Sequence, residues 1–134
     1  MRRCPIEVDV YELFRRGSEL LAGRHAHQAV IALERARDAA PRHGSVREAL
    51  ARAYYAAGQP AAARAEFAAA LELDPANDYA HFGLALCLAR EGRRALAVGH
   101  LRLALAMRPE VESYQRALAR LEAAGPGGPA GGRG

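Results

Sequence analysis

Three prolines, Pro41, Pro75 and Pro109, stand about 34 residues apart, and the same classes of residue precede each of them. An internal repeat of this kind constrains the fold strongly, because every copy must form the same supersecondary unit. The copy that ends at Pro75 is the clearest, and it runs Leu50-Ala51, Tyr54, Gly58, Ala63, Phe67, Ala70-Leu71, Leu73-Asp74-Pro75. The chain is therefore expected to consist mainly of three copies of one unit.

Each copy has the pattern of two helices joined by a tight turn. Leu50, Ala51 and Tyr54 stand at helical offsets and form one apolar stripe. Gly58 then suits a turn, and Pro60 suits the first turn of the next helix, where no amide donor is missed. Proline disfavours helix in the residue before it, so Asp74-Pro75 ends the second helix. Each copy is predicted to be a helical hairpin.

The order of these residues resembles the tetratricopeptide repeat (TPR) family. The same classes recur in the other copies, as Leu13, Gly17, Leu20, Ala29, Leu33, Ala36 and as Leu84-Ala85, Leu88, Gly92, Ala97, Leu101, Ala104-Leu105. The first copy departs from the family pattern at Arg16 and Arg37. Arg47 and His81 replace the large apolar residue that opens the second and third copies. We expect these two polar residues to loosen the packing between neighbouring repeats.

The resemblance implies an all-α fold, an α-solenoid of three hairpins with a closing helix. One hairpin cannot cover its own apolar face, so neighbours stack, and three repeats are about the minimum that stands alone. Residues 125–134 are rich in Gly and Pro and are expected to be disordered. The expected segments are a lead-in at 1–9, repeats at 10–43, 44–77 and 78–111, a capping helix at 112–124, and the tail.

Composition excludes several classes of protein. The chain has 134 residues, the size of one domain, with 19 Lys+Arg and 15 Asp+Glu, and every one of these cations is arginine. Two acids soon follow Met1-Arg2-Arg3, and no long uncharged apolar run occurs, so neither an export signal nor a membrane span is expected. We predict a cytoplasmic location, and the abundance of Ala, Arg and Gly indicates a bacterial source.

The sequence offers no recognisable catalytic constellation. Ser18, Ser45 and Ser113 occur without a nucleophile elbow or triad pattern. No glycine segment matches a phosphate-binding loop. Cys4 and Cys87 are too few for a disulfide framework or a metal cluster and are read as reduced thiols. We therefore predict no enzyme activity and no cofactor.

Four histidines are candidate metal ligands. His25 and His27 stand in the predicted turn of the first hairpin, and a pair without Cys or acidic support is a weak metal pattern. Surface turn residues are the favoured interpretation. His81 and His100 fall on helices and are interpreted as packing or rim residues. No metal is predicted.

The resemblance also implies a concave groove lined by the first helix of each hairpin. Aromatic and arginine side chains dominate binding hot spots, and they gather at the groove positions. We predict a non-catalytic scaffold that binds a protein or peptide segment, partly apolar and acidic. Carried over by position, the groove residues are Tyr11, Phe14, Ser18, Leu21, Ser45, Glu48, Arg52, Tyr55, Tyr79, Phe82, Leu86, Arg90, Arg116, Arg120.

Other interpretations stay open. Aromatics could simply pack between helices, as is expected of Tyr54 and Phe67, and the arginines could be solvated. A chaperone-type carboxylate clamp is not expected, because Phe14 and Ser18 replace its first pair and lysine is absent. An arginine-rich face could bind RNA, with affinity that falls steeply as salt rises. A weak homo-oligomer could form if the closing helix exposes its apolar residues, Val111, Leu118, Leu121.

Overall fold

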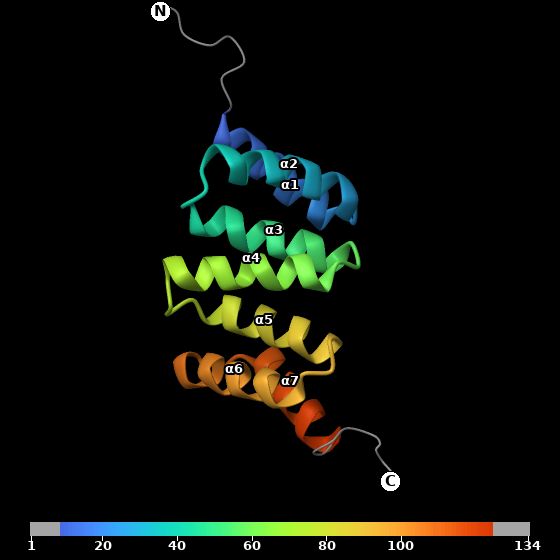
Figure 1. Ribbon diagram of the computed structural model, residues 1–134, viewed down its shortest axis with the longest axis vertical. Helices are drawn as coiled ribbons and strands as arrows, with labels where there is room; N and C mark the ends of the chain where they lie inside the picture. Colours follow the sequence, from blue (N-terminus) through green and yellow to red (C-terminus); the bar gives the residue numbers. More distant parts are fainter. Residues whose placement is uncertain (1–8, 125–134) are drawn as a thin grey trace, which may run out of the picture. The chain divides into compact units, whose positions relative to one another are not determined.

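A computed structural model describes residues 9–124 of the chain, so Cys4 and the predicted disordered tail lie outside the described residues. Within the described part, the chain is entirely helical between its turns, and no residue forms a strand. This confirms the predicted all-α fold class. The seven helices (Figure 1) are α1 Val10–Ala22, α2 Ala26–Ala39, α3 Gly44–Ala56, α4 Pro60–Leu73, α5 Asp78–Arg90, α6 Arg94–Met107 and α7 Glu112–Ala124.

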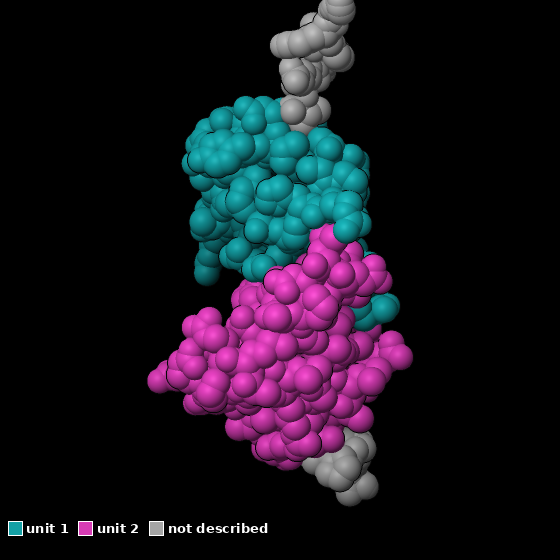
Figure 2. Space-filling model, turned by 90° about the vertical axis from the view of Figure 1, so that its left-hand side faces the viewer, with its two compact units in different colours: residues 1–66 teal, residues 67–134 magenta. Residues whose placement is uncertain are grey.

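The chain divides into two compact units, drawn in separate colours in Figure 2. Unit 1 comprises residues 1–66 and unit 2 comprises residues 67–134. In unit 1, α1 and α2 form an extensively packed hairpin, and α3 packs on α2. In unit 2, α5 and α6 form the corresponding hairpin, and α7 packs on α6.

The core of unit 1 is built from small and branched side chains. Leu33 of α2 and Leu50 of α3 are fully buried. Burying each leucine side chain contributes about 2 kcal/mol relative to leaving it in water. Gly17 of α1 allows the close approach of α2, because a Cβ atom at Gly17 would lie 2.5 Å from Leu33 Cγ. The packing of α1 on α2 therefore requires glycine at position 17, where the first copy of the repeat carries it.

Unit 2 uses the same arrangement with larger side chains. Leu101 of α6 is fully buried, and Cys87 of α5 is buried as a free thiol. Phe67, at the start of unit 2, is 2 % exposed. Its ring fills the space over Gly83 of α5, where an added Cβ would lie 2.2 Å from Phe67 Cζ. Phe67 is thus a core residue, as expected.

The three hairpin turns close with the same backbone hydrogen bond. The amides of His25, Gln59 and Arg93 donate to carbonyls five residues earlier, over N–O distances of 2.8, 2.9 and 2.8 Å. This bond requires a left-handed residue just before the donor. Glycine fills that place in the second and third turns, at φ +82° for Gly58 and +79° for Gly92.

The first turn departs from the expected arrangement in two ways. Its left-handed residue is Arg24, at φ +68°, although Gly23 stands directly before it. The turn is also shorter than predicted, because α2 begins at Ala26. His25 is therefore the N-cap residue of α2, and His27 lies within the helix rather than in the turn. Both histidines are exposed, as expected for surface residues.

Substituting the turn glycine of unit 2 should separate backbone strain from helix propensity. Gly92→Ala is expected to lower the free energy of unfolding by about 1 kcal/mol, because alanine must adopt a left-handed conformation. Gly99→Ala, in the open interior of α6, is the matched control and should raise the free energy of unfolding by about 1 kcal/mol. Urea unfolding followed by circular dichroism measures both values. A stabilising Gly92→Ala would contradict the turn geometry.

Candidate functional site

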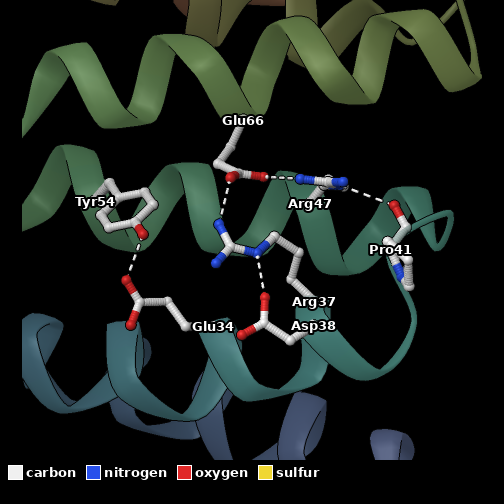
Figure 3. A network of polar contacts seen from close by, with 7 residues as sticks. All are labelled: Glu34, Arg37, Asp38, Pro41, Arg47, Tyr54 and Glu66. Carbon is white, nitrogen blue, oxygen red and sulfur yellow. Dashed lines mark hydrogen bonds and ion pairs between the residues drawn. The ribbon is translucent and has the colours of Figure 1, made fainter.

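A buried carboxylate with two arginine partners links the helices of unit 1 (Figure 3). Glu66 of α4 is only 6 % exposed. Its Oε2 atom accepts from Arg37 Nη1 over 2.7 Å, and its Oε1 atom accepts from Arg47 Nη1 over 2.9 Å. Arg47 Nε also donates to the carbonyl oxygen of Pro41 over 2.9 Å, and Arg37 Nε donates to Asp38 over 3.1 Å. The cluster joins α2, α3 and the first part of α4.

The network corrects the expectation that Arg47 loosens the packing. Its guanidinium is partly buried and lies between the carboxylate of Glu66 and a backbone carbonyl. Burial by itself lowers the pKa of Arg37, but hydrogen bonds to Glu66 and Asp38 and their charges outweigh it, so the pKa is raised overall. Arg37 and Arg47 thus stand at positions where polar contacts within unit 1 replace apolar packing.

Tyr54 adds a second polar link between α2 and α3. Its ring is buried, and its hydroxyl donates to Glu34 Oε2 of α2. Burial and the hydrogen bond to Glu34 raise the pKa of Tyr54 to about 12. Tyr54 is therefore a packing residue, as the sequence indicated, and its hydroxyl remains protonated at neutral pH.

Removing the carboxylate of Glu66 should destabilise unit 1 strongly. Glu66→Gln leaves two partly buried guanidinium groups without their counter-charge, and we expect a loss of about 3 kcal/mol in the free energy of unfolding. Glu72→Gln on the exposed side of the same helix is the control and should change it by less than about 0.5 kcal/mol. Chemical denaturation of both variants compares the two. Equal effects would show that the Glu66 contacts add no stability.

In unit 2, two histidines face each other across the α5–α6 hairpin. His81 is 8 % exposed, and its Nδ1 atom lies 3.0 Å from Nδ1 of His100. His81 Nε2 lies 3.1 Å from the carbonyl oxygen of Pro75. A carbonyl can only accept, so Nε2 of His81 donates to it. In the neutral ring Nδ1 of His81 then accepts from Nδ1 of His100. His81 therefore has both ring nitrogens paired instead of loosening the packing.

The surroundings of His100 disfavour a positive charge on its ring. Burial, and then the neighbouring His81 ring, lower the pKa of His100 below its ordinary value of 6.5. Two protonated rings would also place two N–H donors against each other. Over residues 9–124, no group of three or more His, Cys, Asp or Glu side chains is arranged to hold a metal ion.

Stability should depend on pH through this pair. The folded pKa of His100 lies below the unfolded value, so the unfolded chain binds more protons as the pH falls below about 6.5, and stability is lost there. Above that pH the contribution is fully present. Thermal unfolding at pH 7.5 and pH 5 should show a drop in Tm that His100→Gln reduces and that the exposed-site variant His27→Gln leaves unchanged. A drop that persists in His100→Gln would exclude this cause.

A row of aromatic rings crosses unit 2 and includes two predicted groove residues. Ring centroids lie 6.3 Å apart for Phe67 and Tyr79, 5.8 Å for Tyr79 and Phe82, and 4.8 Å for Phe82 and Tyr114. Tyr114 of α7 is 3 % exposed, and its hydroxyl donates to Asp78 Oδ2 over 2.6 Å. Burial and Asp78 raise the pKa of Tyr114. Tyr79 and Phe82 are half-buried, so part of each ring faces solvent.

The remaining groove residues of unit 2 are more dispersed. Leu86 is half-buried on α5, and Arg90 is exposed at its end. Arg116 and Arg120 are exposed on α7, and Arg116 forms an ion pair with Glu112 over 3.2 Å. Sequence reasoning did not include Tyr114 in this set, because its core-facing position becomes apparent only once α7 packs on the hairpin.

The apolar residues on α7 and directly before it that suggested self-assembly are partly covered within unit 2. Val111, Leu118 and Leu121 are all half-buried. Arg94 Nε of α6 also donates to the carbonyl oxygen of Leu121 over 2.8 Å. These contacts reduce the apolar surface that α7 offers to a second copy.

The predicted groove residues of unit 1 lie on α1 and α3 or beside them. Tyr11 is 71 % exposed, and Arg52 and Ser45 are also exposed. The Phe14 ring lies 6.2 Å from the ring of His43, which precedes α3. The others are half-buried, and they are Ser18, Leu21, Glu48, Tyr55. Contacts therefore bring Phe14 to the start of α3, whereas Tyr11 extends into solvent.

No helix within residues 9–124 is both long and apolar enough to cross a membrane. Among curated proteins, none matches the sequence. A family model for the tetratricopeptide repeat matches residues 14–78 and 48–112, which together span most of the chain.

Solved structures with the same fold share little sequence with the chain. The first TPR of Spaghetti (RPAP3), bound to an HSP90 peptide, matches with a TM-score of 0.83 at 18 % identity, covering 89 % of this chain and 97 % of that one. The Yersinia enterocolitica type III secretion chaperone SycD, in complex with a peptide of the translocator YopD, matches with a TM-score of 0.74 at 18 % identity, covering 90 % and 92 %. YrrB, described as a TPR protein with an unusual peptide-binding site, matches with a TM-score of 0.78 at 20 % identity, covering 84 % and 58 %.

Proposed function

The chain belongs to the tetratricopeptide repeat family, and on this premise we propose that it is a non-catalytic scaffold that binds a protein or peptide segment. The family fold is typically a platform for protein interaction rather than for catalysis. Two structural neighbours are complexes with peptides, of HSP90 in one case and of YopD in the other. These likenesses support peptide binding as the class of function.

The observation that carries the proposal is the half-exposed face of Tyr79 and Phe82 on α5. Both rings rest on buried aromatics, Phe67 on one side and Tyr114 on the other. Each ring contacts the core with one edge and faces solvent with the other. Because the core contacts already fix its rotamer, the ring offers contact area to a ligand without a further loss of side-chain entropy. Such preorganised aromatic side chains are typical binding anchors.

The exposed arginines of unit 2 favour an acidic segment. Arg90, Arg116 and Arg120 of unit 2 are exposed, and lysine is absent from the sequence. Arginine pairs with carboxylates through two parallel hydrogen bonds, which favours a peptide that combines apolar and acidic side chains. The groove residues of unit 1 are proposed to contribute in the same way. A cytoplasmic location and a bacterial source belong to this proposal.

Capture of partners from a cell extract tests the aromatic face. The double variant Tyr79→Ala, Phe82→Ala should reduce recovery of a captured protein by about tenfold or more, as expected for loss of hot-spot anchors. Leu103→Ala, which removes a large exposed apolar side chain of α6 in the same unit, is the control and should leave capture unchanged.

Circular dichroism must show equal helicity in all three proteins for the comparison to hold. Equal capture by the wild-type chain and the double variant would contradict the proposal that the face of Tyr79 and Phe82 binds the partner. Recovery of RNA instead, with affinity that falls steeply between low and high salt, would favour the alternative of nucleic-acid binding.

A further inference from the structure

The first hairpin carries an open hollow that the groove prediction does not include. It lies between α1 and α2 and has a volume of about 390 Å³. Ile31 is 62 % exposed there, so the hollow presents a large aliphatic side chain to solvent. The residues that line the hollow are Leu13, Arg16, Leu20, Gln28, Ile31, Ala32, Arg35.

The α1 residues that line the hollow can be compared with the residues at the same repeat positions of α3. Arg16 and Leu20 of α1 stand at the repeat positions of Leu50 and Tyr54 of α3. On α3 these residues are buried, α2 packs against the helix, and the Tyr54 hydroxyl donates to Glu34 of α2. On α1 the same positions border an open hollow instead. The face of α1 thus occupies the repeat position at which α3 receives another helix, with Leu20 kept as a large apolar residue and Arg16 in place of the leucine.

The cations of the hollow indicate the charge of an occupant. Arg16 and Arg35 are exposed, and within residues 9–124 neither guanidinium has a hydrogen-bond or ion-pair partner. Arg15, one position away, is by contrast paired with Glu12 and Glu19. Two unpaired guanidinium groups beside an apolar surface attract carboxylates and repel other cations.

The same charges argue against a second copy of this chain as the occupant. Two hollows placed face to face would bring four arginines together. The closing helix α7 exposes Glu112 and Glu122 beside Arg116 and Arg120, and both glutamates are already paired with arginines of unit 2. It therefore offers no unpaired carboxylate to Arg16 and Arg35 of a second copy. Like charges at an interface oppose association. A partner with acidic side chains pairs with Arg16 and Arg35, whereas a second copy of the chain does not.

We propose that the α1–α2 hollow docks an acidic amphipathic helix of another protein. The apolar side chains of that helix lie on Leu13, Leu20 and Ile31, and its carboxylates pair with Arg16 and Arg35. Docking of an amphipathic helix through spaced apolar anchors is a recurring mode of recognition. This site lies in unit 1 and does not depend on the aromatic face of α5.

Two synthetic peptides serve as probes. Both are preformed helices with leucines on one face, and the polar face carries glutamate in one peptide and lysine in the other. Fluorescence anisotropy with the full chain should show binding of the glutamate peptide and not of the lysine peptide. Ile31→Ala and the charge-reversed Arg16→Glu, Arg35→Glu should each weaken the glutamate peptide by about tenfold or more, and the charge reversal should allow the lysine peptide to bind.

Two control variants distinguish binding at the hollow from a general effect of net charge and from binding at the aromatic face. Arg42→Glu, Arg93→Glu changes the net charge equally at exposed positions outside the hollow and should leave binding unchanged. Tyr79→Ala, Phe82→Ala should also bind the glutamate peptide normally, even if the aromatic face proves inactive.

The proposal is overturned if the full chain binds neither peptide, binds both equally, or binds the glutamate peptide regardless of Ile31 and the two arginines. Sedimentation that reveals a dimer dissociated by Arg16→Glu, Arg35→Glu would identify a second copy as the occupant and would equally overturn it.

Discussion

Close approach between helices at small residues is the constraint on which both units depend. Gly17 leaves room for Leu33, and Gly83 leaves room for the ring of Phe67. With no side chain at these points, a large residue of the neighbouring helix fills the space and the backbones come near enough for alanines to be buried. The alanine-rich composition is thereby compatible with a dense core, although few large side chains are available.

Helices packed this closely leave no room for water beside an interior polar side chain. Its hydrogen-bond partners must therefore come from the same unit. Arg47 finds Glu66 and the carbonyl of Pro41, and His81 finds His100 and the carbonyl of Pro75. In both cases a side chain at the opening position of a repeat donates to the carbonyl of the proline that ends the preceding one. Both side chains are thereby paired, which avoids the desolvation penalty that they would otherwise impose.

The sequence predicts those parts of the structure that depend on local chemistry. The end of α4 before Asp74-Pro75 and the turn at Gly58 follow from backbone preferences of the residues themselves. The side-chain partners of Arg47 and His81, which are Glu66 and His100, stand 19 residues away in each case, and no local pattern specifies them. The sequence did not predict the hollow because Leu20, which is half-buried beside it, has the residue class of a fully buried position. Whether another helix covers such a residue is a property of the assembled unit.

The charged network around Glu66 also bears on how unit 1 responds to heat. Keeping a carboxylate and two guanidinium groups away from water costs free energy because their hydration is lost. The hydration free energy of charged groups becomes less favourable as temperature rises, whereas apolar burial gains little more. The cost of holding Glu66 between Arg37 and Arg47 therefore falls on warming. The network contributes most near the upper end of the temperature range in which unit 1 is folded.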